Sequence, residues 1–394
     1  MKFAHVSDLH VGAFQDAYFR EKERKTIQTF VEMCIKENLD FVLVSGDLFD
    51  SNIPPMSEAI MLVREFRKLR DAGIRIYCVF GSHDSSPTRS SMIELLAAEG
   101  LIREVDDMIE DATGTIIGGV HGLAGAKEVH YYRETHFKTP DPSKPSVFMF
   151  HTAVTEANMV PLDQSIPLSS LPTGYKYYAG GHLHRRVELE LNGSPVNYPG
   201  PLFLGYGLRD LEEYARHSFS GFYIVEMTDS VSFRYVELKP LNCTLVDFDS
   251  AGLSDEECIR ELEKEVKAAL KDMEPQSLIL VKVYGQLASG SRANVTSFLE
   301  TLRRTVKGME IRVNDNQLID FEDPPLEAGE NEDERLLADL AETFPITVDT
   351  QFMGTLIDIL AQPKPEGKTV QDFMEDLYDF HVKPLLAGKG VPLE

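Results

Sequence analysis

The chain has 394 residues, of which 43% are hydrophobic and 26% are charged, a composition typical of a folded globular protein. This length exceeds that of one ordinary core, so two or three domains are expected. The formal net charge of −25 argues against a strong nucleic-acid-binding patch on the chain itself, because phosphate binding depends on Lys and Arg.

Membrane and redox features point to a reducing, aqueous compartment. No apolar run is long enough to cross a membrane, and no apolar leader segment follows Lys2. The chain has four cysteines, and no pair has the close spacing of a zinc or redox motif. We therefore expect a cytoplasmic protein with no membrane partner.

The first half of the chain alternates predicted strands and helices. Strands are expected at residues 3–6, 41–44 and 74–80, and helices at 19–37, 56–72 and 91–98. A hairpin is expected at 108–118, strands at 147–150 and 177–179, and short antiparallel strands joined by turns from 187 to 238. This βαβ order predicts a layered α/β domain over residues 1–238.

A second module is predicted over residues 239–321. Its strands are expected at 244–248, 278–284 and 309–313, and its helices at 254–271 and 294–306. Residues 322–334 are rich in Pro, Gly and acidic residues and are predicted to be a linker. Amphipathic helices are predicted within the tail, residues 335–394. From residue 322 to the end there are 17 acidic and 5 basic residues, so much of the net charge lies outside the first two modules.

Five short polar motifs each follow an apolar strand. They are Asp8-Leu9-His10, Gly46-Asp47-Leu48-Phe49-Asp50, Gly81-Ser82-His83-Asp84, Phe150-His151-Thr152 and Gly180-Gly181-His182-Leu183-His184. In α/β folds the carboxyl ends of the strands border the crevice that binds ligands. One such motif by itself is more often a cap or a turn than a metal site. Five together, all of carboxylate and imidazole chemistry, provide enough ligands for two ions.

The order of these motifs resembles the calcineurin-like metallophosphoesterase superfamily. The fuller pattern, which includes Tyr198-Pro199-Gly200, resembles the SbcD/Mre DNA double-strand-break-repair nucleases. Specific motifs cover about the first two hundred residues, and a looser resemblance extends to residues 239–321. It implies a four-layer αββα domain, a smaller α+β capping domain that contacts DNA, and a helical C-terminal tail.

The resemblance also implies a role for each motif residue. The implied metal ligands are Asp8, His10, Asp47, Ser82, His151, His182 and His184, with Asp47 bridging two ions. Two Mn²⁺ ions are expected, with Fe²⁺ or Mg²⁺ as possibilities, and a water between them would attack phosphorus as hydroxide. His83 is expected to protonate the departing 3′ oxygen, with Asp50 orienting its ring. Ser82 departs from the family's usual Asn and predicts weaker binding of the second ion.

The implied function is Mn-dependent processing of DNA ends, as a 3′–5′ exonuclease and single-strand endonuclease. The implied partner is an SbcC-like, SMC-family ABC ATPase bound by the tail, and helices 56–72 and 91–98 are expected to form a homodimer. Arg89, Arg185 and Arg186 flank the motifs and could meet DNA phosphates, although solvated surface charge explains them as well. An archaeal or bacterial, nucleoid-associated protein fits this set.

Two alternatives stay open. The first is another calcineurin-like phosphodiesterase or phosphatase that acts on a nucleotide, phospholipid or phosphoprotein and has no ATPase partner. The second is a non-catalytic scaffold on the same fold. The additional module and tail disfavour the first, and the nearly complete set of motif residues disfavours the second.

Overall fold

The structure is a computed structural model that describes residues 1–84, 91–135, 137–271, 273–274, 277–306, 308–321 and Lys383. Residues 1–321 form one compact unit and residues 322–394 another. The linker predicted at 322–334 and the helices predicted in 335–394 fall outside the described residues.

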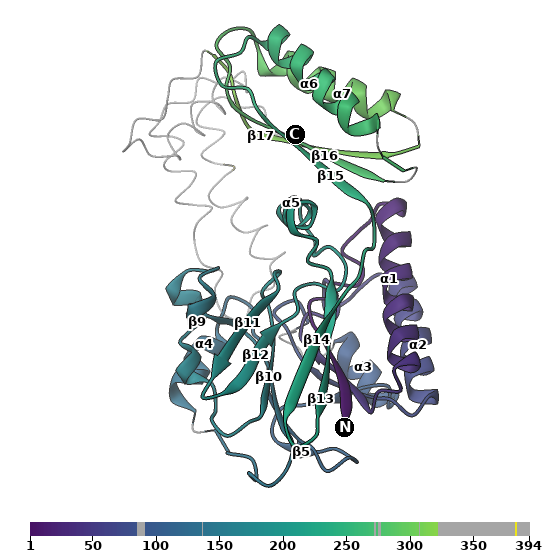
Figure 1. The fold of residues 1–394 in the computed structure, drawn as a ribbon, viewed down its shortest axis with the longest axis vertical. Coiled ribbons are helices and arrows are strands. Elements are labelled where there is room, and N and C mark those ends of the chain that lie inside the picture. The colour runs from purple at the N-terminus through teal and green to yellow at the C-terminus, as the bar shows by residue number, and fades with distance from the viewer. Residues whose placement is uncertain are drawn as a thin grey trace. The chain divides into compact units, whose positions relative to one another are not determined.

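Two six-stranded sheets pack face to face in the first part of the chain (Figure 1). The first sheet has the order β14 (Val231–Glu237), β13 (Gly221–Met227), β1 (Lys2–Val6), β2 (Phe41–Ser45), β3 (Arg75–Val79) and β4 (Arg103–Glu104). The second has the order β11 (Val187–Leu191), β12 (Ser194–Tyr198), β10 (Tyr177–Gly181), β7 (Ser146–His151), β6 (Ile116–Val120) and β5 (Ile109–Glu110). A short pair, β8 (Ala153–Val154) and β9 (Ser165–Ile166), lies beside them.

The side-chain period of the strands explains the layers. In β2, Phe41 and Leu43 enter the core between the two sheets, whereas Val42 and Val44 enter the core on the outer face. Because alternate residues of a strand face opposite sides, a strand buried on both faces needs a continuous apolar run. The fully buried sequence of β2 meets that need.

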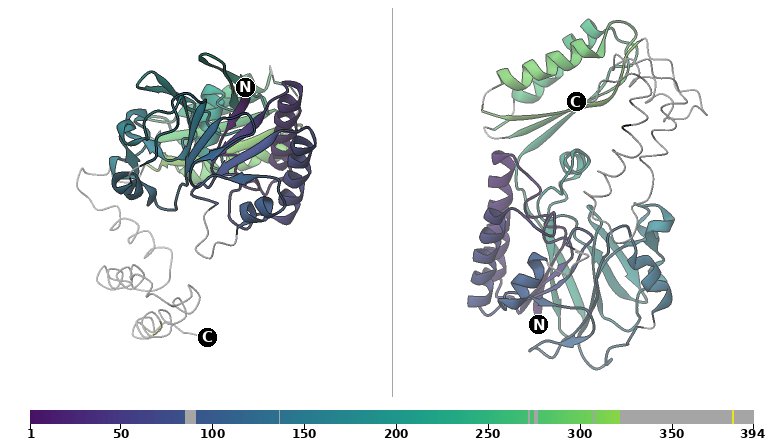
Figure 2. Two further views of the ribbon diagram at one scale, coloured as in Figure 1. Left: turned by 90° about the horizontal axis from the view of Figure 1, so that it is seen from below. Right: turned by 180° about the vertical axis from the view of Figure 1, so that it is seen from behind.

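Helices cover the outer faces of both sheets (Figure 2). Those on the first sheet are α1 (Ala17–Lys36), α2 (Met56–Asp71) and α3 (Met92–Ala98). The second sheet carries α4 (Glu128–Glu134) and the 3-10 turns η1 (Thr155–Ala157), η2 (Leu162–Gln164) and η3 (Leu168–Ser170). The expected four-layer order of helix, sheet, sheet and helix is therefore present.

The prediction of only short antiparallel strands from 187 to 238 is wrong in two respects. A helix, α5 (Leu208–His217), interrupts this segment, and β12 pairs parallel with β10 although it pairs antiparallel with β11. Only Leu211 and Tyr214 of α5 are buried, so its apolar period is too short to be recognised in the sequence.

Residues 239–321, hereafter the three-stranded module, have a sheet and core of their own. Strands β15 (Cys243–Asp249), β16 (Leu278–Gln286) and β17 (Glu310–Ile319) pair in parallel. Helices α6 (Asp255–Lys271) and α7 (Arg292–Thr305) pack on this sheet and close the core. Parallel strands need such crossover helices. The module therefore alternates strand and helix as α/β folds do, and differs in this from the α+β arrangement expected from the sequence.

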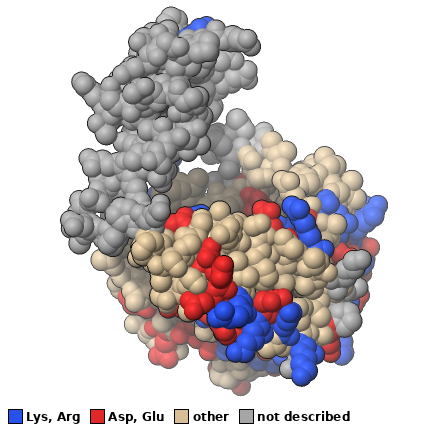
Figure 3. Space-filling model, turned by 90° about the horizontal axis from the view of Figure 1, so that it is seen from above, with Lys and Arg blue, Asp and Glu red and all other residues tan. Residues whose placement is uncertain are grey.

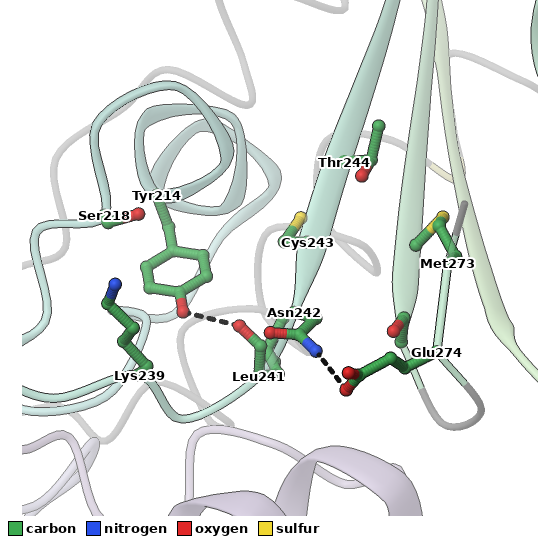
Figure 4. A pocket seen from close by; sticks show the side chains of 10 residues that line it. Tyr214, Ser218, Lys239, Leu241, Asn242, Cys243, Thr244, Met273 and Glu274 are labelled. Atoms are coloured by element: carbon green, nitrogen blue, oxygen red, sulfur yellow. Dashed lines mark hydrogen bonds between the residues drawn. The ribbon is translucent and has the colours of Figure 1, made fainter. Parts of the chain in front are cut away.

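The module joins the two packed six-stranded sheets, hereafter the sandwich, through an apolar cluster with residues from both parts. In this cluster Leu278 and Leu280 pack with Phe19, Phe203 and other residues. A cavity of about 350 Å³ lies at this junction between α5 and β15 (Figure 4). At its edge, the Tyr214 hydroxyl donates to the Leu241 carbonyl at 2.7 Å.

The module carries charges of both signs on its surface. Lys and Arg side chains lie next to Asp and Glu side chains on the face shown in Figure 3. Along the helices, Lys264 pairs with Glu261 at 3.2 Å and Lys267 with Glu263 at 2.6 Å. Across the described residues, we find no helix with the length and apolar character needed to cross a membrane.

Candidate metal centre

The polar motifs lie at the carboxyl ends of β1, β2, β3, β7 and β10 and in the loops that follow these strands. Asp8, His10 and Asp47 have backbone φ angles of 52°, 43° and 48°, in the left-handed region. Non-glycine residues seldom adopt this conformation, and such strain is concentrated at functional sites. The loops thus turn abruptly enough to aim successive side chains inward.

Two glycines make the close approach of these loops possible. Gly46 has a φ of +84°, and a Cβ on it would lie 2.2 Å from Nδ1 of His151. A Cβ on Gly181 would lie 1.8 Å from the Ser45 carbonyl oxygen. The Gly residues of the sequence motifs therefore let the loops of the two sheets meet.

Asp8, His10 and His184 form one group of converging side chains. Nε2 of His10 lies 3.0 Å from Nε2 of His184, and the latter lies 3.7 Å from Oδ1 of Asp8. Asp8 and His10 are fully buried. Nδ1 of His184 faces the carboxylate of Asp210 at 3.1 Å and donates to it, so the lone pair of Nε2 points toward His10.

Asp47 and His151 form a second group, again with Asp8. His151 donates from Nδ1 to the Ser45 carbonyl at 2.8 Å, which leaves Nε2 3.1 Å from Oδ2 of Asp47. Nε2 of His10 is 3.8 Å from the same carboxylate oxygen, so Asp47 borders both groups. Two acceptors at such distances are stabilised by a cation or a proton between them.

The two remaining predicted ligands lie at the margin of these groups. The ring of His182 packs against that of His151 with centroids 5.2 Å apart, and its backbone N–H donates to Asp8. Ser82 donates from Oγ to Oδ2 of Asp47 at 3.4 Å. The structure thus brings all seven predicted ligands to one site, with His182 and Ser82 less directly placed.

The residues present fit divalent cations, which the structure does not contain. Within the described chain, ligand atoms of Asp8, His10 and His184, and those of Asp8, Asp47 and His151, lie within 4.8 Å of one another. Nε2 of His151 is buried and lies 3.1 Å from Oδ2 of Asp47 without the geometry of a regular hydrogen bond. Carboxylate and imidazole ligands without a thiolate suit Mn²⁺, Fe²⁺ or Zn²⁺.

The pKa shifts of the site histidines indicate that the buried carboxylates are stabilised by a positive charge beside them. Burial lowers the pKa of His10 well below its usual value, and the neighbouring His184 lowers it further. Burial also opposes protonation of His151, but the adjacent Asp47 outweighs it and raises the pKa of His151 to about 10. A proton on His151 thus compensates the carboxylate where no ion is bound, and a divalent ion would displace that proton.

His83 lies beside the ligands but is more exposed. Its Nδ1 donates to the backbone carbonyl of Asp50 at 2.7 Å, and the Asp50 carboxylate is farther away, at 3.9 Å. Its ring is 4.8 Å from the ring of His10, between centroids. The hydrogen bond to His83 is therefore accepted by the backbone of Asp50 and not by its carboxylate, and Nε2 of His83 takes no part in it.

Asp84, the last residue of its motif, holds two loops together. Its buried carboxylate accepts from the backbone N–H groups of Leu48, Phe49 and Gly81 at 3.0 to 3.1 Å. Burial raises the pKa of Asp84 to about 6 even though these hydrogen bonds favour the ionised form. Its position is structural, since it fixes the loops that carry Asp47 and His83.

Two residues of the site were missed by the sequence analysis. Asp210, on α5, accepts from His184 and from the backbone N–H groups of Tyr206 and Gly207. The Tyr206 ring packs against His10, His83 and His184, with centroids 4.8, 5.1 and 5.2 Å apart. An acidic residue three positions after Gly207 is a helix-capping signal, but nothing in the sequence indicates that it reaches a histidine.

Two of the three arginines predicted to contact DNA form ion pairs with glutamates of the same chain. Arg185 pairs with Glu213 at 2.9 Å, and Arg186 pairs with Glu188 and lies 4.5 Å from the centroid of the Tyr235 ring. These contacts support the reading of both residues as compensated surface charges. Arg89 lies outside the described residues.

Comparison with known proteins identifies the family of the first 186 residues. The family model described as calcineurin-like phosphoesterase matches residues 1–186. The DNA double-strand break repair protein Mre11 of Archaeoglobus fulgidus is 26% identical over 340 residues, with 79% of this chain and 74% of the relative covered. Proteins of the same name from Sulfurisphaera tokodaii and Sulfolobus acidocaldarius are 32% and 27% identical, with 49% and 68% of this chain and 51% and 72% of the relatives covered.

Among solved structures, a dimetal phosphatase from Danio rerio aligns with a TM-score of 0.40 and 11% identity, covering 60% of this chain and 96% of that one. A likeness this partial carries no argument about function. The family match, the Mre11 relatives and the geometry of the site agree with one another. Residues 1–186 therefore form a calcineurin-like phosphoesterase domain, the chain is similar to the Mre11 repair proteins, and it is a metal-dependent phosphodiesterase.

Proposed function

We propose that this chain is a DNA nuclease that processes DNA ends in double-strand break repair. The observation that carries the proposal is the meeting of Asp8, His10, Asp47, His151 and His184 at one edge of the sandwich, with His83 beside them. The substrate comes from the relatives, which are named DNA double-strand break repair proteins.

The ligand residues prepare the site for a phosphodiester. Two divalent ions, when bound, would supply charge stabilisation at the phosphate and an activated water. Asp210 and the Ser45 carbonyl fix the rings of His184 and His151, so that their Nε2 atoms stay directed at the site. We propose Mn²⁺ as the ion, because the donors are oxygen and nitrogen atoms only.

His83 has the position of a general acid. Because its Nδ1–H is held by the Asp50 carbonyl, a protonated His83 can donate its second proton only from Nε2. The ring is 30% exposed and lies beside the ligand His10, where a departing 3′ oxygen would be within reach. Donation to that oxygen neutralises the charge that builds up as the P–O bond breaks.

The test is cleavage of end-labelled linear and hairpin DNA with Mn²⁺, Mg²⁺ or a chelator. Wild-type protein is expected to cut with Mn²⁺, and His83→Ala to cut about 10²- to 10⁴-fold more slowly, the usual contribution of a general acid. Calorimetric Mn²⁺ binding should be unchanged in this variant. The matched control is His130→Ala, because His130 lies exposed beyond the site and should retain wild-type rates. The product lengths reveal 3′–5′ exonuclease or single-strand endonuclease action.

An uncut DNA substrate would decide against the proposal. If a generic small phosphodiester is still hydrolysed, the protein acts on a substrate other than DNA. The net charge of −25 and the pairing of Arg185 with Glu213 are the observations that favour this second candidate. Loss of both activities with intact Mn²⁺ binding would favour the non-catalytic scaffold.

We further propose that residues 335–394 bind an SMC-family ABC ATPase. The segment carries apolar residues at helical spacing, among them Leu336, Leu340, Phe352, Leu356 and Leu360. It also belongs to a unit separate from residues 1–321. Truncation after Glu330 should abolish co-purification with the ATPase and leave cleavage of a small diester intact. Undiminished ATPase binding by the truncated chain would refute this role.

A homodimer through α2 and α3 is proposed on their exposed apolar side chains. Met56 and Ile60 of α2 are 65% and 45% exposed, and Leu95 of α3 is 52% exposed. Exposed apolar groups gathered on neighbouring helices are typical of a protein interface.

We also propose that the three-stranded module is a DNA-contacting capping domain. The support is its separate core and its attachment to α5, next to the metal centre. Added DNA should then slow amide hydrogen exchange in residues 239–321. Unchanged exchange in this range would refute the contact.

A further inference from the structure

A second pocket adjoins the metal centre on the side of His184. It has a volume of about 430 Å³, within the range of about 300–1,000 Å³ that is usual for small-molecule sites. Its walls come from residues 158–160, 182–185 and 206–213. Because His184 lines this pocket and also belongs to a group of metal-ligating side chains, a ligand here would lie next to the reacting phosphate.

Tyr206 provides a flat aromatic surface at the boundary between the two. Its ring contacts three histidines of the metal centre, yet the residue is 50% exposed. Burial therefore does not account for a large aromatic residue at this polar site. The apolar side chains of Met159 and Val160 line the same pocket, and a methionine adapts well to the face of a ring.

The charged groups of the pocket leave one cation available. Asp210 is occupied by His184 and two backbone N–H groups, and Glu213 by Arg185. Arg209, also part of the lining, is exposed and forms no ion pair with any residue that the structure describes. An anion entering the pocket would thus meet Arg209 without displacing an existing partner.

We propose that this pocket binds the nucleoside next to the scissile phosphate, with its base against Tyr206 and Met159 and a flanking phosphate on Arg209. Stacking on an aromatic ring tolerates every base, as an enzyme that degrades DNA of any sequence requires. The inference rests on the nuclease function proposed above. It identifies the residues that would contact the base and the sugar of the substrate, in addition to the scissile phosphate.

The test compares deoxyadenosine 5′-monophosphate with 2-deoxyribose 5-phosphate, in which a hydroxyl group replaces the base. Binding is measured by calorimetry on Mn²⁺-loaded full-length protein carrying His83→Ala, which limits turnover. The nucleotide should bind about 5- to 150-fold more tightly, the range for stacking of one base. Adding Tyr206→Phe should keep this preference, and Tyr206→Leu should remove it while retaining apolar contact with the histidines.

Further measurements separate the subsite from the fold and from the nuclease proposal. Arg209→Gln should weaken both ligands and leave the preference for the base intact. Mn²⁺ affinity, measured for each variant, reports an intact metal centre. The subsite is refuted if the starting protein shows no preference for the base, or if Tyr206→Leu retains it. If wild-type protein leaves DNA uncut but the preference depends on Tyr206, the nucleoside subsite stands and the nuclease proposal fails.

Discussion

Replacing Asp210 with Asn should weaken metal binding although Asp210 is not itself a ligand. The carboxylate accepts from Nδ1 of His184 at 3.1 Å and from the backbone N–H groups of Tyr206 and Gly207 at 3.0 and 3.3 Å. The His184 contact fixes the ring orientation and makes Nε2 a better donor to a cation. An amide has nearly the same shape but no charge, so both effects diminish.

The magnitude follows from the nature of this hydrogen bond. A bond to a charged group contributes about 1.5–3 kcal/mol, and loss of a residue that orients a metal-bound histidine usually lowers metal affinity about 10- to 100-fold. The side chain of Asp210 is only 16% exposed, so water replaces the contact poorly. We therefore expect the Kd for Mn²⁺ to rise 10- to 100-fold in Asp210→Asn.

The assay is isothermal titration of metal-free protein with Mn²⁺, together with thermal unfolding without metal. Glu213→Gln is the matched control, because Glu213 lies one turn farther along α5 and pairs with Arg185 instead of a histidine. That variant should bind Mn²⁺ like wild type. Saturating Mn²⁺ should largely restore the activity of Asp210→Asn, since its effect is on affinity. Wild-type Mn²⁺ affinity in Asp210→Asn would refute the orienting role.

Helix α5, which carries Asp210, also contacts the three-stranded module. Two residues after Asp210, Glu212 pairs with Lys282 at 2.9 Å and accepts from Asn314 at 2.6 Å. The same helix therefore contacts a metal-site histidine and the sheet of the module.

Three other predictions concern metal affinity, pH and assembly. Ser82→Asn should tighten binding of the weaker Mn²⁺ ion, because an amide oxygen is a longer and better ligand than the hydroxyl now 3.4 Å from Asp47; unchanged titration curves would show that Ser82 does not limit affinity. Burial raises the pKa of Glu23 from 4.5 to about 8, so its favourable contribution to stability is complete below about pH 4.5 and is lost as the pH rises through 8. In urea unfolding, Glu23→Gln should remove a decline on the order of a few kcal/mol across this window, and parallel pH profiles for the two proteins would contradict the assignment. Ile60→Glu should convert a dimer into a monomer in light scattering, whereas a wild-type monomer at tens of micromolar would exclude the proposed interface.

The sequence by itself determined the layers and the metal chemistry. Strands such as β2 are short, apolar on both faces and followed at once by ligands, so local pattern and motif order are sufficient. The motif residues Asp8, His10, Asp47, His151 and His184 were predicted as ligands because that order resembles a known family, and the structure brings them together. The carboxyl ends of parallel strands share one edge, which makes this meeting a consequence of topology.

Tertiary structure alone decided which groups support those ligands. Asp210 lies 26 positions after His184 in the chain, on a helix whose short apolar period concealed it, and only folding brings the two within 3.1 Å. The same holds for Tyr206 against His10, and for the choice of the Asp50 carbonyl over its carboxylate at His83. Such contacts depend on the meeting of loops from two sheets, and no local sequence pattern encodes the relative position of residues so distant along the chain.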